Sequence, residues 1–204
     1  MQNITAHEVA KYIIYKANQE PEPDITNLKL QKLLYYAQGE HFANTGQPLF
    51  ADDFEAWAFG PVIRSEYSRY CDFSNRVLPI PEKDTLELPV TTLSFLDEIV
   101  ARYGKYSASY LVTKTHAELP FKKNFKNSGK FLIPKEDIKL FFCKEREKEY
   151  LIEWNKNAKM VNSLEISEEE FDDIVETKEE PVINENLKNL FEQYERGELG
   201  VRPT

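Results

Sequence analysis

The sequence predicts a mainly α-helical protein with a small two-stranded β element, an α+β fold in which helices supply most of the core. Two observations lead to this prediction. Apolar residues recur at intervals of three and four in several segments, which indicates amphipathic helices. Only two short runs, residues 54–59 and 131–133, have the composition of strands, and the second is long enough only to pair with the first. With 204 residues, of which 41% are hydrophobic, the chain can bury a core of domain size.

Two helices are expected in the first part of the chain. Thr5 followed by Glu8 has the spacing of a capping box, and the apolar residues after it predict a helix of about twelve residues. A proline-containing stretch closes this helix. Thr26 or Asn27 then caps a second helix, which Gly46 is well placed to end in the left-handed conformation.

The second helix is apolar on two sides. One face carries Leu30, Leu33, Leu34, Ala37 and His41, and the other carries Leu28, Tyr35, Tyr36 and Gly39 with Lys29 and Lys32. A helix that is apolar on both faces is packed from two directions, so this one is predicted to be the central helix. Its side chains Lys29, Lys32 and Tyr36 are expected to be free to contact a partner.

The predicted elements that follow are shorter. Gly60 and Pro61 are expected to stop the first strand, and a helix from residue 62 to about 71 follows them. Prolines then mark an extended connection. Thr92 and Ser107 can cap two more helices.

Pro120 is expected to end the helix that Ser107 opens. Pro134 at a first helical position opens another helix, with Phe141 and Phe142 on its apolar face. That apolar face is lost across residues 144–149, which predicts a boundary between a domain of residues 1–143 and a helical extension of residues 144–204.

The extension contains three separate amphipathic pieces, beginning near Tyr150, Ser167 and Leu187. The last piece is too short to hold its shape alone, because ordering about eleven residues costs more than burying four side chains returns. It is expected to dock on this body, on a second copy or on a partner. Its predicted partner-binding residues, with one from the second piece, are Phe171, Leu187, Leu190, Phe191 and Tyr194.

All of the net charge of −9 lies near the carboxy terminus. Through Leu164 the chain has 22 basic and 22 acidic residues, and after it 4 basic and 13 acidic residues. A neutral body with an acidic tail argues against nucleic-acid binding as the main role, because that affinity depends on cation density. The tail is expected to meet a basic surface or to keep the protein soluble. No apolar run approaches membrane-spanning length, so a cytoplasmic protein without a membrane partner is expected.

Candidate chemistry is sparse. The histidines His7, His41 and His116 read as surface or core-edge groups rather than metal ligands, and Cys71 and Cys143 fit neither a disulfide framework nor a zinc site. No nucleophile lies beside a base and no glycine-rich turn could hold a phosphate, so no catalytic residue, metal or cofactor is predicted.

Two minor alternatives stay open. An enzyme would use His116 with Glu118. A lysine cluster between residues 114 and 139 is interpreted first as a solvated loop, second as a docking surface for the acidic tail or for an acidic partner, and third as a nucleic-acid contact, which no recognition-helix pattern accompanies.

The helix at residues 25–39, followed by Trp57 and the Gly60-Pro61 pair, resembles the signature of the Panacea domain. This domain occurs in SocA-like antitoxins and in many phage and prophage proteins. Thr115, His116 and Pro120 resemble its later element, with Phe121 where tryptophan is usual. The resemblance covers about residues 4–142. The positions carried over as structural signature residues are Asn27, Leu30, Gln31, Leu33, Tyr35, Trp57, Gly60, Pro61, His116 and Pro120.

The resemblance implies a non-catalytic antitoxin that neutralises a co-encoded toxin by direct protein–protein binding. One alternative is a proteolytic adaptor that delivers a toxin to a host protease, and another is a phage-encoded regulatory protein with weak nucleic-acid contact. The implied partner is a toxin with a basic contact surface. A host protease, a chaperone and a further copy of the chain are also considered as partners. Specificity is expected in the extension, because a shared domain that serves unrelated toxins needs a variable element.

Overall fold

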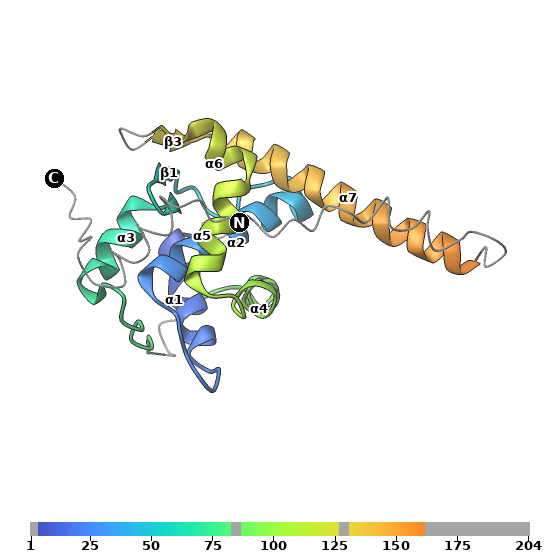
Figure 1. Cartoon of the computed structure of the whole chain (residues 1–204). Coiled ribbons are helices and arrows are strands. Elements are labelled where there is room, and N and C mark those ends of the chain that lie inside the picture. Colours follow the sequence, from blue (N-terminus) through green and yellow to red (C-terminus); the bar gives the residue numbers. More distant parts are fainter. Residues whose placement is uncertain (1–3, 83–86, 127–130, 162–204) are drawn as a thin grey trace.

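Helices surround one central helix in the computed structural model of the protein, which describes residues 4–82, 87–126 and 131–161. The central helix is α2 (Asn27–Thr45), and it contacts α1 (Ala6–Ala17), α4 (Val90–Tyr103), α5 (Ala108–Ala117) and α7 (Lys135–Val161). The shorter elements α3 (Arg64–Tyr70), the 3₁₀ turn η1 (Cys71–Phe73) and α6 (Leu119–Asn124) fill the periphery. A small sheet lies at one side (Figure 1). The predicted fold class, mainly α with a small β element, is confirmed.

The predicted caps of the first two helices are confirmed. Thr5 Oγ1 accepts a hydrogen bond from the amide of Glu8 at 3.2 Å, and the Thr5 amide donates to Glu8 Oε2 at 2.8 Å. Thr26, rather than Asn27, caps α2, and Gly46 ends it in the left-handed conformation with φ of 71°. These short-range signals therefore set where both helices begin and where α2 ends.

Both faces of α2 are buried, as its sequence predicts, but this burial includes the residues expected to be free. Lys29 Nζ donates to both oxygens of Asp24 at 2.5 and 2.6 Å and to the carbonyl of Gly104 at 2.6 Å. Lys32 Nζ donates to the carbonyl of Pro61 at 2.8 Å, and Tyr36 lies in the core. The prediction that Lys29, Lys32 and Tyr36 are free to contact a partner is wrong, because neighbouring elements cover both faces of the helix.

The sheet has three strands in the order β2-β1-β3, one more than predicted among the described residues. As expected, β3 (Phe131–Ile133) pairs with β1 (Phe54–Trp57). The first strand ends before Gly60 and Pro61, as expected, but these two residues begin a further strand, β2 (Gly60–Val62), which pairs with β1. The predicted helix starts only at Arg64. Proline is tolerated here because β2 is an edge strand.

Two buried glutamines of α2 fix the loops around it. Gln31 Oε1 accepts from the amide of Ile63 at 2.9 Å. Gln38 accepts from the amides of Leu49 and Phe50 at 3.0 and 3.2 Å and donates to the carbonyl of Phe50 at 3.1 Å. Each glutamine therefore satisfies backbone groups that the folded chain shields from water.

Replacing Gln38 by leucine should lower the free energy of unfolding by about 3 kcal/mol, because three buried backbone groups then lose their partners. Urea denaturation followed by circular dichroism measures the change. Gln19→Leu, at an exposed position after α1, is the matched control and should stay within about 0.5 kcal/mol of the wild type. Equal stabilities of the two variants would contradict the assigned role of Gln38.

Two helix boundaries differ from the predictions. α4 begins at Val90, directly after Pro89, and not after Thr92. Ser107 caps α5 as expected, with Oγ accepting from the amide of Tyr110 at 3.2 Å, but α5 ends at Ala117, and Pro120 lies in the first turn of α6. A proline fits a first turn because its missing N–H has no partner there in any case.

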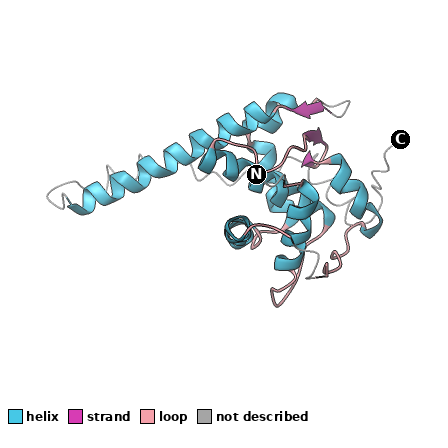
Figure 2. Ribbon diagram, turned by 180° about the vertical axis from the view of Figure 1, so that it is seen from behind, coloured by secondary structure: helices cyan, strands magenta, loops and turns pink. Residues whose placement is uncertain are grey.

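α7 is one continuous helix and extends well beyond the body (Figures 1 and 2). The loss of its apolar face across residues 144–149 does not break it, because lysine, arginine and glutamate are good helix formers that pair along the helix. Lys148 Nζ and Glu145 Oε1, for example, lie 2.7 Å apart. The division between residues 1–143 and 144–204 stays a prediction. The positions Phe171, Leu187, Leu190, Phe191 and Tyr194 lie outside the described residues.

Within the described ranges, no helix combines the length and the apolar character that crossing a bilayer requires.

Candidate functional site: a tyrosine-lined pocket

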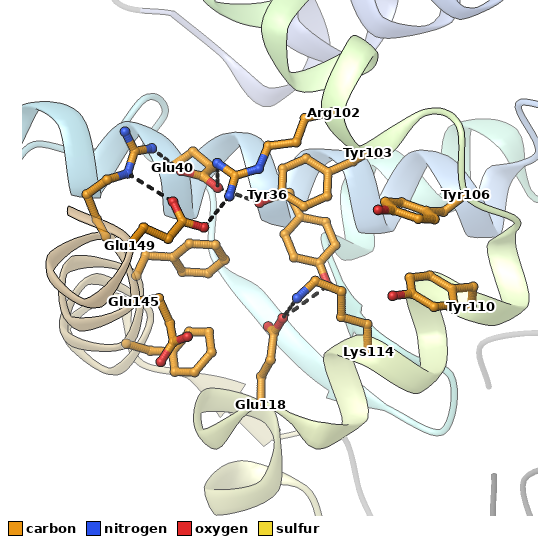
Figure 3. Close-up of a pocket in the computed structure, with 13 residues that line it drawn as sticks. Tyr36, Glu40, Arg102, Tyr103, Tyr106, Tyr110, Lys114, Glu118, Glu145 and Glu149 are labelled. Carbon is orange, nitrogen blue, oxygen red and sulfur yellow. Dashed lines mark hydrogen bonds and ion pairs between the residues drawn. The ribbon is translucent and has the colours of Figure 1, made fainter. Parts of the chain in front are cut away.

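A pocket of about 260 Å³ opens where α2, α4, α5 and α7 meet (Figure 3). Tyrosine rings and charged groups line it. They come from α2 (Tyr36, Glu40), from α4 and the turn after it (Arg102, Tyr103, Tyr106), from α5 and its C-cap (Tyr110, Lys114, Glu118), and from α7 (Phe141, Phe142, Glu145, Arg146, Glu149). The pocket therefore lies between the body of the protein and the first half of α7.

Four tyrosines form two stacked pairs at the pocket. The rings of Tyr36 and Tyr103 are nearly parallel with centroids 4.2 Å apart, and those of Tyr106 and Tyr110 stack at 4.6 Å. The inner pair is buried, whereas Tyr110 is 41% exposed. The hydroxyl groups of Tyr106 and Tyr110 make no hydrogen bond to any residue in the described ranges, so both can accept or donate one to a ligand.

An ion-pair network closes one end of the pocket. Glu40 of α2 is buried and pairs with Arg102 Nη1 at 3.2 Å and with Arg146 Nη2, and it accepts a hydrogen bond from the Tyr103 hydroxyl. Glu149 of α7 pairs with Arg102. These contacts tie α7 to α2 and α4, and they leave the charges of both arginines neutralised within the protein.

Glu118 lies at the other end of the pocket and is only 5% exposed. Its Oε1 accepts from the Tyr36 hydroxyl at 3.1 Å and lies 3.6 Å from Lys114 Nζ. Its Oε2 has no hydrogen-bond partner among the described residues. Burial raises the pKa of Glu118 from 4.5 to about 7, against the opposing charge of Lys114 and the hydrogen bond from Tyr36.

His116, the histidine of most interest in the sequence, does not line the pocket. Its ring packs on Phe121 with centroids 4.3 Å apart, and its Nε2 has no hydrogen-bond partner among the described residues. Burial and the nearby charge of Lys32 lower the pKa of His116 to about 4, against a hydrogen bond to the backbone of Ala58. His116 is therefore neutral at pH 7. None of the hydrogen bonds and ion pairs within the described residues joins it to Glu118.

Comparison with known proteins identifies the family of the chain. Residues 30–121 match the family described as "Antitoxin SocA-like, Panacea domain". The chain is also 33% identical over 127 residues to Antitoxin SocA of Caulobacter vibrioides (strain NA1000 / CB15N), over 57% of this chain and 67% of that protein. The chain belongs to the SocA-like Panacea-domain family. No solved structure matches the chain.

The residues that resemble the Panacea signature lie in the core or at its edge. Leu30, Leu33 and Tyr35 of α2 are buried, and Gln31 connects α2 to Ile63, the residue between β2 and α3. Asn27 Nδ2 donates to the carbonyl of Tyr67 at 3.0 Å. The other signature residues are at the β1–β2 corner (Trp57, Gly60, Pro61) and where α5 meets α6 (His116, Pro120).

Position 60 of this Panacea domain requires glycine. Its φ is 97°, and a Cβ atom there would lie 2.8 Å from Lys32 Nζ and 2.9 Å from Thr115 Oγ1. Only glycine combines this backbone conformation with that close approach. The corner of the sheet can therefore rest directly on the buried lysine.

Sequence reasoning missed most of the pocket, since of its lining residues only Tyr36 was named as a partner-binding residue. Tyr110 and Lys114 lie four residues apart on α5, and Phe141, Glu145 and Glu149 follow at intervals of four on α7, which are local signals for shared helix faces. Of the predicted lysine cluster, Lys123 pairs with Asp137 at 2.7 Å, and Lys135 pairs with Asp53. Among the described residues, no group of three or more His, Cys, Asp or Glu side chains could hold a metal ion.

Proposed function

We propose that the protein is an antitoxin that neutralises a co-encoded toxin by binding it directly, without catalysis. The observation that carries the proposal is the 33% identity to Antitoxin SocA over 127 residues, together with the match of residues 30–121 to the Panacea domain. The proposed partner is a toxin protein with a basic contact surface.

The proposed contact surface is the extension, beginning with the distal part of α7. The family match ends at residue 121, so α7 lies outside the matched segment. Where α7 leaves the body, Tyr150, Leu151 and Ile152 are consecutive apolar residues with exposures of 69%, 52% and 49%. Such an exposed apolar group is typical of a site that a partner covers. The acidic residues after Leu164 would add attraction to a basic toxin and speed the encounter.

Co-expression with the neighbouring reading frame tests the proposal. The neighbour alone should stop growth, and growth should return when this protein is present at an unchanged level of toxin. A neighbour that is harmless alone, or equally toxic with and without this protein, would contradict the proposal. A toxin level that falls upon rescue would contradict neutralisation by direct binding.

Two double substitutions locate the contact. Tyr150→Asp with Leu151→Asp on α7, and Leu187→Asp with Phe191→Asp beyond the described residues, should each abolish rescue while the unfolding curve of the domain stays unchanged. Val90→Asp is the matched control, because Val90 is apolar and 77% exposed at the start of α4. Its rescue should equal that of the wild type. If both double variants still rescue, the extension is not the binding element.

A further inference from the structure

We propose that the tyrosine-lined pocket binds the guanidinium group of an arginine side chain from the protein partner. The identity of the partner rests on the proposed function, whereas the chemistry of the pocket rests on the side chains that line it. Four observations support a cationic side chain in this place: an undercompensated carboxylate, aromatic faces that already hold cations, the size of the pocket, and its position against α7.

The first observation is the environment of Glu118. A buried carboxylate is normally paired and fully hydrogen-bonded, because removing its charge from water is costly. Among the described residues Glu118 accepts a hydrogen bond from Tyr36 at 3.1 Å, the Tyr35 hydroxyl also favours its charged form, and its nearest cation is Lys114 at 3.6 Å. Its Oε2 has no partner among the described residues. In Figure 3 the Glu118 carboxylate points toward the Lys114 ammonium group and the Tyr36 hydroxyl, so a cation that takes the place of Lys114 would meet it.

The second observation is that the rings of the pocket attract cations. Lys114 Nζ lies 5.7 Å from the ring centroid of Tyr36, and Lys105 Nζ lies 5.3 Å from that of Tyr106. These distances are typical of cation–π contacts. Because the Lys114 side chain is 40% exposed and only loosely paired, it can move aside and yield its place to a ligand cation. The hydroxyls of Tyr106 and Tyr110 would then accept hydrogen bonds from the guanidinium.

The third observation concerns size and charge. A volume of about 260 Å³ is below the range of drug-sized ligand sites, about 300 to 1,000 Å³, and suits a single inserted side chain. The two arginines of the pocket are already neutralised by Glu40 and Glu149. An anionic ligand would therefore find few free cations, whereas a cation would find Glu118.

Arginine fits this site better than lysine. Its planar guanidinium offers five donors, stacks on aromatic rings and is more weakly hydrated than an ammonium group. Arginine side chains are also enriched among the residues that dominate binding energy at protein interfaces. The pocket lies against α7 through Phe141 and Glu145, so a partner that covers the distal part of this helix could place a side chain here.

Titration of the full-length protein with N-acetyl-L-arginine methylamide, followed by NMR of the tyrosine ring signals, tests the inference. The titration is run at about pH 8, where Glu118, with a pKa of about 7, is ionised. Saturable binding with a millimolar Kd is expected, with shifts of the Tyr106 and Tyr110 signals. The uncharged isostere N-acetyl-L-citrulline methylamide should bind at least about 10-fold more weakly, because the charge is lost while the shape is kept.

Two variants complete the test. Glu118→Gln should weaken binding of the arginine probe at least about 10-fold, whereas Glu98→Gln, an exposed position on α4 outside the pocket, should leave it unchanged. If Glu118→Gln fails to fold, Tyr110→Leu at the partly exposed rim takes its place and should weaken binding several-fold.

Three results would overturn the inference: equal binding of the citrulline probe, tighter binding of N-acetyl-L-glutamate methylamide, or no saturation up to about 20 mM of the arginine probe. The outcome is separate from that of the proposed function. Growth rescue without arginine binding removes the pocket inference alone, and arginine binding without a toxic neighbour removes the antitoxin proposal alone.

Discussion

Gly39→Ala is expected to lower the free energy of unfolding by about 2 kcal/mol, although alanine is the better helix former by about 1 kcal/mol. A Cβ atom at position 39 would lie 2.2 to 2.4 Å from three ring carbons of Phe142. The ring cannot move aside easily, because Tyr35, Tyr36 and Phe141 surround it with ring centroids 5.5, 6.1 and 5.3 Å away. α7 would therefore have to shift away from α2.

Urea denaturation of the single and double variants measures this effect. Phe142→Leu alone should also destabilise the protein, since it leaves a cavity. In the presence of Phe142→Leu, however, Gly39→Ala should cost much less or become stabilising, because the smaller side chain admits the new methyl group. If Gly39→Ala matches or exceeds the wild type in stability, the close approach of α2 and α7 is wrong.

The second large expected effect is the pH dependence of stability, in which Glu118 and His116 oppose one another. Glu118 has an ordinary pKa of 4.5 and a folded pKa of about 7. As the pH rises, the folded state holds the Glu118 proton to a higher pH than the unfolded state does. The contribution of Glu118 to the free energy of unfolding therefore falls by about 3 kcal/mol between pH 4.5 and 7.

His116 acts in the opposite direction. Its pKa falls from 6.5 to about 4 on folding, so the unfolded state binds a proton first as the pH is lowered. The stability from His116 is full above pH 6.5 and is lost, by about 3 kcal/mol, as the pH falls to 4. Between pH 4.5 and 6.5 the two slopes cancel, and the two groups together leave the wild-type stability nearly flat.

Single substitutions should expose each slope. Relative to the wild-type curve, the free energy of unfolding of Glu118→Gln should rise with pH by about 3 kcal/mol between pH 4.5 and 7, and that of His116→Gln should fall by about 3 kcal/mol between pH 4 and 6.5. Urea denaturation at half-unit pH steps measures both. The double variant serves as the control and should again be nearly flat between pH 4.5 and 6.5. Parallel curves for all four proteins would show that neither group is perturbed.

The parts of the fold that were predicted correctly depend on short stretches of chain. The caps at Thr5 and Thr26 and the turn at Gly46 involve residues within four positions of one another, and the two-sided apolar pattern of α2 is visible in its own sequence. The pairing of residues 131–133 with the first strand is correct as well, because few segments of the chain have strand composition.

The incorrect parts depend on distant contacts. Lys29 can be buried because its ammonium group donates a hydrogen bond to the carbonyl of Gly104, 75 residues later. Lys32 can be buried because its ammonium group donates to the carbonyl of Pro61. The sequence around a lysine does not indicate which distant carbonyl its ammonium group will contact. The pocket escaped prediction for the same reason. Glu40, Arg102 and Arg146 are ordinary charged residues until the fold brings three helices together.

The close contact of Gly39 with Phe142 and the ion pair of Glu40 with Arg146 both hold α7 on the body through the first half of the helix. Tyr150, Leu151 and Ile152 lie beyond these contacts and are about half or more exposed, so changes there have little effect on folding. The residues that hold the fold together are thus separate from those proposed to contact the partner. A lineage could exchange one binding partner for another through the outer half of α7 while the domain beneath it stays the same.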